Sequence, residues 1–190
     1  MVMLAMMPWV TSSAQTNIAL YKTVVAQSVE NSTPQYAATN VNDGDVSTKW
    51  SSHGSDFKQW IYIDLGRGYK INKVVLKYAD NYAPNAYQVQ VSNNATTWSA
   101  IYTWGGGTTF RTTDEITPSG TVTARYVRFS GNGRGTIPAG FTSRYRIAEF
   151  EIFGQDPEPL TPEQQTSINT IAQRLEQREL AVAFDITSVT

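Results

Sequence analysis

Apolar and polar residues alternate along much of this chain, and that two-residue period constrains the fold more than any other feature of the sequence. In residues 59–65 three aliphatic side chains fall on one face, while Trp60, Tyr62 and Asp64 fall on the other. The same alternation recurs in four shorter segments, residues 73–78, 86–91, 125–129 and 150–153. Half-buried strands have this pattern, so the sequence predicts β-structure.

No comparably long helical period occurs before residue 155. We therefore predict an all-β fold, an antiparallel β-sandwich of the jelly-roll type. Three tryptophans, Trp50, Trp60 and Trp98, lie in the strand patterns, and we expect them to belong to the core. With 190 residues the chain has room for one domain of ordinary size and an appendage.

The composition changes after residue 154. Residues 155–161 contain prolines and acidic residues, as a short linker does. Thr161 is a suitable N-cap and Pro162 suits the first position of a helix, which we expect to run to about residue 179. Residues 180–186 then alternate like a strand. Residues 162–190 are thus predicted to form a helix plus a strand, either the start of a following module or a short helical tail that docks on the sandwich.

The N-terminal segment is apolar and ends in small residues, as a secretory signal does before its cleavage site. No basic residue precedes Lys22, so we predict that residues 1–16 are signal-like or disordered. Charged residues make up only 16% of the chain, which suits an extracellular domain. We expect the protein to be secreted. No apolar run approaches the roughly 20 residues that span a membrane, so we expect no membrane-spanning helix. We also do not expect a membrane as the main partner.

Cysteine is absent and His53 is the only histidine. Thiol nucleophiles, disulfides and multi-histidine metal sites are therefore excluded. The net charge is −1 and no basic run carries interleaved aromatic residues, so we expect no nucleic-acid partner. Residues 125–146 nevertheless hold five arginines and no acidic residue, which makes an anionic ligand conceivable. These are Arg125, Arg128, Arg134, Arg144 and Arg146.

Residues 40–52 contain an Asp-Gly-Asp turn with several oxygen donors. Asp43, Asp45 and Thr48 supply carboxylates and a hydroxyl, the groups that hold a hard cation such as calcium. The spacing does not match an EF-hand loop, and an Asp-Gly-Asp sequence is more often only a turn. From these residues alone, both interpretations stay open.

Several motifs follow one another in a characteristic order. They are residues 17–20 (NIAL), 43–45 (DGD), 48–50 (TKW), 60–66 (WIYIDLG), 87–92 (YQVQVS), 125–128 (RYVR) and 148–154 (AEFEIFG). With these motifs the chain resembles the discoidin, or coagulation factor V/VIII type C, domain over residues 17–154. It is most similar to the family 32 carbohydrate-binding modules of bacterial polysaccharide-degrading enzymes. The resemblance implies a galactose-binding-like β-sandwich with one structural calcium and a glycan site in loops at one end.

The resemblance also implies the residues of both sites. The calcium ligands would be Asn40, Asp43, Asp45, Thr48, Ala148 and Glu149. The glycan contacts would come from Glu30, Tyr36, His53, Asp80, Asn81, Tyr82, Asn132, Arg134 and Phe141. The chain lacks the arginine that the galactose-binding branch carries after the strand ending at Tyr78, which argues against galactose. The five arginines favour an acidic polysaccharide such as alginate, while Glu30 and Asp80 favour a β-glucan or chitosan.

We therefore expect a non-catalytic carbohydrate-binding module that targets a polysaccharide-degrading enzyme in the same polypeptide to its glycan. The alternative is a discoidin-type adhesion domain that binds a protein or phospholipid surface, with Ile137 and Phe141 as the only apolar loop tips. A glycosidase needs two carboxylates at a fixed separation, and the acidic residues here lie mostly in turns, in the predicted calcium site or in the tail.

Overall fold

The computed structural model describes residues 16–54, 58–79, 83–106, 111–133, 144–156 and 161–187. The chain divides into two compact units, Met1–Pro157 and Glu158–Thr190. The described part of the first unit contains strands β1 Thr23–Ala26, β2 Trp50–Ser51, β3 Gln59–Tyr78, β4 Ala86–Ser92, β5 Ser99–Gly105, β6 Thr113–Ile116, β7 Val122–Gly133 and β8 Arg146–Gln155. Three short 3₁₀ turns stand between β1 and β2: η1 Glu30–Ser32, η2 Pro34–Tyr36 and η3 Ala38–Val41.

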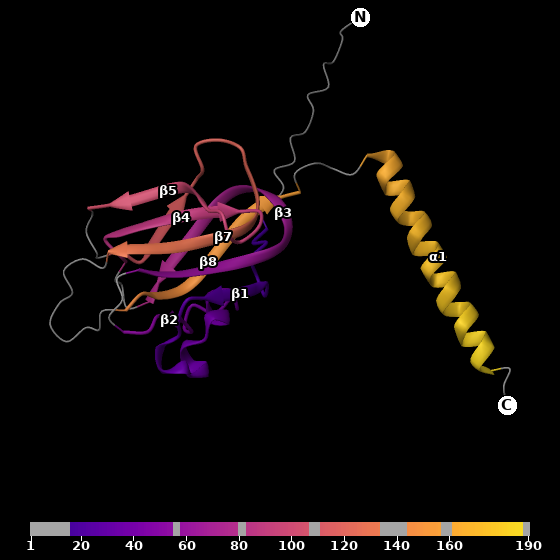
Figure 1. Cartoon of the computed structure of the whole chain (residues 1–190), viewed down its shortest axis with the longest axis horizontal. Helices are drawn as coiled ribbons and strands as arrows, with labels where there is room; N and C mark the ends of the chain where they lie inside the picture. The colour runs from indigo at the N-terminus through magenta and orange to yellow at the C-terminus, as the bar shows by residue number, and fades with distance from the viewer. Residues whose placement is uncertain are drawn as a thin grey trace, which may run out of the picture. The chain divides into compact units, whose positions relative to one another are not determined.

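The long strand β3 belongs to both layers of the sandwich (Figure 1). Residues 59–71 of β3 pair with β7 and residues 61–64 also with β1, whereas residues 70–78 pair with β8 and residues 74–77 with β6, always antiparallel. The register of the β3–β7 ladder shifts between Asp64 and Tyr69, where Gly66 adopts a left-handed φ of 85°. Glycine reaches this conformation at little cost, so Gly66 accommodates the irregularity while β7 stays paired with β3 on both sides of it. The predicted antiparallel β-sandwich is confirmed.

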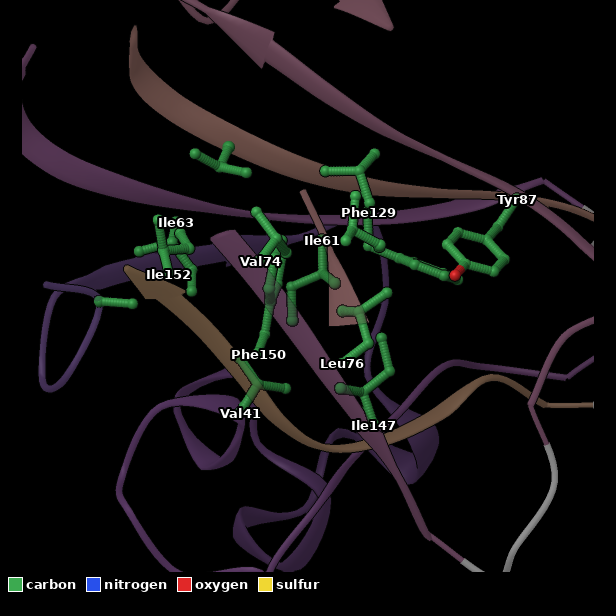
Figure 2. Packing of buried hydrophobic residues seen from close by; sticks show 14 of the residues in the cluster. Val41, Ile61, Ile63, Val74, Leu76, Tyr87, Phe129, Ile147, Phe150 and Ile152 are labelled. Carbon is green, nitrogen blue, oxygen red and sulfur yellow. The ribbon is translucent and has the colours of Figure 1, made fainter. Parts of the chain in front are cut away.

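The core lies between the two parts of β3 and their neighbours (Figure 2). Ile61 and Ile63 from the first part and Leu76 from the second are each 0% exposed. Phe129 of β7 and Phe150 of β8 are buried equally well. Burial of one such side chain stabilises the fold by roughly 1.5–3 kcal/mol. The alternation in residues 59–65 therefore identified the inward face correctly.

The three tryptophans of the strand patterns have different environments. Trp50 is fully buried, and its indole N–H donates to the Ser28 carbonyl at 2.9 Å. Trp60 and Trp98 are partly exposed and do not join the core cluster, so our expectation for these two is wrong. Trp60 alternates with Ile61, which points inward, and therefore faces outward. Alternation shows which residues share a face, but it does not show that a large aromatic side chain is buried.

One end of the sandwich gathers segments that are distant in sequence. β3 begins at Gln59 beside Gly131 and ends at Tyr78 beside Ile147. Tyr145, just before β8, lies against Gly131 and Phe129 of β7, so the loops that leave these strand ends emerge close together. We call this region the loop end; its described part comprises residues 27–36, 51–54, 85, 132 and 144–146.

The second unit contains helix α1, Pro162–Thr187. The helix begins at Pro162 as predicted, but residues 180–186 continue it, and the predicted strand over these residues is wrong. Leucine and alanine at positions 180, 181 and 183 favour helix, and extending an existing helix is cheaper than starting a strand that has no partner. No helix in the described residues is long and apolar enough to cross a membrane.

Candidate functional site

The turn over residues 40–48 brings the predicted oxygen ligands close together. The Thr48 hydroxyl lies 2.8 Å from Asp43 Oδ2, 3.0 Å from the Asp45 carbonyl and 3.4 Å from the Asn40 carbonyl. Asp43 Oδ1 accepts a hydrogen bond from the Asp45 amide at 2.9 Å, and the Asp45 carboxylate accepts one from the Ser47 amide. The Asp45 side chain is thus held within the turn, and its backbone oxygen faces Thr48.

Glu149 of β8 contributes a second carboxylate beside this turn. It is only 1% exposed, and neither carboxylate oxygen has a hydrogen-bond partner among the described residues. Burial, and then the negative charge of nearby Asp43, raise the pKa of Glu149 to about 7. A buried carboxylate without a donor and opposite a second carboxylate is costly, and a bound cation would remove that cost.

The register of β8 also supports a cation site beside Glu149. Lys77 pairs with Glu149 and Tyr78 pairs with Ile147, so the β3–β8 ladder skips Ala148. Such bulges often occur next to functional sites, where they redirect backbone groups such as the Ala148 carbonyl. Among the described residues the Lys77 ammonium forms its ion pair with Glu151, at 2.7 Å, and not with Glu149. The described residues contain no group of three or more histidine, aspartate or glutamate side chains that could hold a metal ion, so a cation here would depend on two carboxylates, one hydroxyl and backbone carbonyls.

Glu30 is at the loop end, but it is buried and paired. It is 5% exposed and accepts a hydrogen bond from the Ser51 hydroxyl at 2.5 Å. Arg144 approaches Glu30 Oε1 at 2.9 Å, and Arg146 approaches Oε2 at 4.0 Å. Glu30 thus joins η1, β2 and the start of β8. The sequence had not indicated these two arginines as partners of Glu30, because nothing local relates residues so far apart.

Three other predicted glycan contacts lie at the loop end. His53 and Asn132 are exposed, and Tyr36 is partly exposed on η2, which lies against β2. The backbone amide of His53 donates to the Ser28 hydroxyl at 3.0 Å, which fixes the backbone beside its side chain. The remaining predicted contacts, Asp80, Asn81, Tyr82, Arg134 and Phe141, lie outside the described residues.

A polar cluster at the strand ends stabilises the loop end. Asp114 of β6 accepts hydrogen bonds from the hydroxyls of Tyr78 and Tyr87, at 2.8 and 2.6 Å, and two from the Arg111 guanidinium. Burial opposes ionisation of Asp114, but these donors outweigh it, so its pKa is lowered. Arg111 also stacks on Trp104, 4.6 Å from the ring centroid. No local signal in the sequence indicates this cluster, because it depends on pairing between distant strands.

The F5/8 type C domain family matches residues 23–147. The chain belongs to this family. It shares 29% identity over 97 residues with the polysaccharide lyase 8 family protein HylA of Enterococcus faecalis, a stretch that covers 50% of this chain and 7% of the lyase. The chain therefore corresponds to a small part of that curated relative.

Solved structures similar to this chain include two modules of one enzyme. Chitosan-binding module 1 of a chitosanase/glucanase from Paenibacillus sp. IK-5 is 35% identical, with a TM-score of 0.64 over 73% of this chain and 99% of the module. Module 2 of the same enzyme, solved with chitotriose, is 33% identical, with a TM-score of 0.62 over 73% of this chain and 100% of the module. The module CpGH89CBM32-5 of Clostridium perfringens, solved with GalNAc-β-1,3-galactose, is 21% identical and shares the fold, with a TM-score of 0.58 over 69% of this chain and 94% of the module.

Proposed function

We propose that this chain is a non-catalytic module that binds a polysaccharide at its loop end and holds an attached polysaccharide-degrading enzyme near that substrate. The observation that carries the proposal is the match to the two chitosan-binding modules, each covered over nearly its whole length at 33–35% identity. Tethering raises the local concentration of an enzyme at its glycan without a catalytic group in the module. Because such polysaccharides lie outside the cell, the proposed function goes together with secretion of the protein.

The geometry of the carboxylates supports a role without catalysis. Within the described chain, Glu30, Asp64 and Asp114 each bind an arginine, and Glu149 lies near Asp43 beside the turn over residues 40–48. A glycosidase acid or nucleophile must instead be open to the sugar. The attached enzyme is expected in another part of the polypeptide.

The glycan has two supported candidates. Arg144 and Arg146 both face Glu30, so the described loop end is less basic than the five arginines suggest. The similarity to chitosan-binding modules supports chitosan or a β-glucan. Binding of an acidic polysaccharide such as alginate would depend mainly on Arg134, a contact predicted from the sequence, whose guanidinium suits a planar carboxylate.

We also propose a structural calcium. Asp43, Thr48 and Glu149 would bind it through side chains, and Asn40, Asp45 and Ala148 through backbone oxygens. Hard oxygen donors of this kind suit calcium, and the unpaired Glu149 carboxylate fits a cation. Binding would link the early turn to the last strand of the sandwich and stabilise the fold.

Affinity electrophoresis of the whole chain tests the proposed function. Native gels would contain alginate, polygalacturonate, laminarin or soluble chitosan, and mobility would be compared with a gel that contains no polysaccharide. We expect retardation by at least one of them. Loss of alginate retardation in Arg134→Ala, with chitosan retardation retained, would assign the acidic glycan to this residue. Unchanged mobility in every gel would refute the function and favour the adhesion alternative.

A further inference from the structure

The outer face of the sheet formed by β3, β7 and β4 carries a cluster of rings that the loop-end site does not use. We define the aromatic face as Trp60, Tyr62, Trp98, Tyr126, Gln90 and Arg128. The register places Tyr62, Arg128 and Gln90 side by side on adjacent strands. These residues alternate with core residues such as Ile61, Val89 and Val127, and therefore point away from the second layer.

The four rings contact one another rather than the core. Tyr62 stacks with Trp60 at a centroid distance of 5.7 Å and an interplanar angle of 16°. It also contacts Trp98 at 5.5 Å and the edge of Tyr126 at 5.9 Å. All four are partly exposed, and none packs against the buried cluster. The core therefore does not explain why four large aromatic side chains occupy an outward surface.

Arg128 supplies a cation on this face, with no carboxylate partner in the described part of the chain. Its guanidinium lies 4.0 Å from the Trp98 ring centroid, and its Nε and one terminal nitrogen donate to Gln90 Oε1 at 2.8 and 2.5 Å. Among the described residues no carboxylate lies within ion-pair distance of Arg128. The neighbouring Arg125, in contrast, is neutralised by Asp64. The aromatic face thus keeps one positive charge, fixed in place and only partly hydrated.

A uronic acid polysaccharide matches both features. Its sugar rings present apolar C–H faces that pack on aromatic rings, and its carboxylates accept paired hydrogen bonds from a planar guanidinium. An anion at Arg128 would also offset the partial loss of hydration around that charge. A neutral glycan would pack on the aromatic rings but would offer no carboxylate to Arg128.

We propose that the aromatic face is a second polysaccharide-binding surface, separate from the loop end, which takes uronic acid chains with Arg128 as the carboxylate contact. The choice of a polysaccharide over another partner rests on the proposed function. Two surfaces on one module would also allow a single long chain, or two neighbouring chains, to be bound at once.

The test is affinity electrophoresis of the whole chain in polygalacturonate gels, with laminarin and chitosan gels run in parallel. Arg128→Gln and Trp98→Ala should each weaken binding to polygalacturonate by roughly tenfold, since a charged hydrogen bond or a stacked ring is lost. The matched control is Arg67→Gln, which removes the same charge from a residue that is outside the face and binds Asp156. This control should stay within about twofold of the original chain. Melting temperatures of all variants would show that they are folded.

Several outcomes would overturn the proposal. Unchanged polygalacturonate binding in both variants would show that the aromatic face does not bind this polysaccharide. An equal loss in Arg67→Gln would mean that charge alone attracts the polymer. Retardation by chitosan or laminarin but not by polygalacturonate would overturn this inference while the proposed function stands. Retardation by none of the gels would refute both.

Discussion

Arg125 of β7 binds the Asp64 carboxylate of β3 through two hydrogen bonds, Nε to Oδ1 at 2.7 Å and a terminal nitrogen to Oδ2 at 2.8 Å. Asp64 Oδ1 also accepts the Gly66 amide at 2.8 Å. The carboxylate therefore connects the neighbouring strand β7 to the irregular stretch of β3 at Gly66. The pairing with Arg125 lowers the pKa of Asp64.

The first prediction concerns acid stability. Asp64 and Asp114 both have lowered pKa values in the fold, so the stability they contribute is present above the unfolded value of about 3.9. It is lost as the pH falls through their folded values. Urea unfolding at steps from pH 6 to pH 2.5 should show a decline in this range. The decline should be smaller in Asp114→Asn, and an identical profile in the variant would contradict the prediction.

The two carboxylates should differ in their effect at neutral pH. Asp114→Asn should cost about 2–3 kcal/mol, because a partly buried guanidinium and two tyrosine hydroxyls lose a charged acceptor. Asp64→Asn should cost only about 0.5–1 kcal/mol, because the Arg125 side chain is 42% exposed and water screens the pair. Urea unfolding at pH 7 measures both values. Equal costs would mean that the solvent exposure of an ion pair does not determine how much it contributes to stability.

Much of the fold follows from local pattern, but the pairing partners do not. The alternation in residues 59–65 and the proline at position 162 predicted a strand face and a helix start that the structure contains. Alternation in residues 180–186 failed, because a strand needs a neighbour and a helix only needs to continue. The partners of Glu30 come from β2 and from residues 144–146, and no local signal connects them.

The calcium proposal predicts a gain in thermal stability. Added calcium should raise the melting temperature by roughly 5 °C or more, and excess chelator should reverse the change. Glu149→Gln should abolish the response, because it removes the charge that faces Asp43. Glu151→Gln is the matched control, since that carboxylate binds Lys77 and not the turn. A melting temperature that does not respond to calcium or chelator would refute the site.

The packing of Gly131 predicts a steric effect at the loop end. A Cβ at this position would lie 2.3 Å from the ring of Tyr145, which is buried and only 3% exposed. Gly131→Ala should therefore destabilise the fold by about 1–3 kcal/mol, as overpacking does. Gly68→Ala is the control, because its nearest contact is an ordinary 3.6 Å from Thr123. Similar stabilities for both variants would show that Tyr145 moves aside without cost.

The central claim is that the loop end binds a polysaccharide, and the most direct measurement is a titration of the isotope-labelled chain with chitotriose and trigalacturonate, followed by amide chemical shifts. We predict that at least one ligand perturbs residues at the loop end, among them Tyr36, His53 and Arg144, in a saturable manner. Shifts around Arg128 with trigalacturonate would report on the aromatic face separately. If neither ligand perturbs the loop end at millimolar concentration, the claim is contradicted.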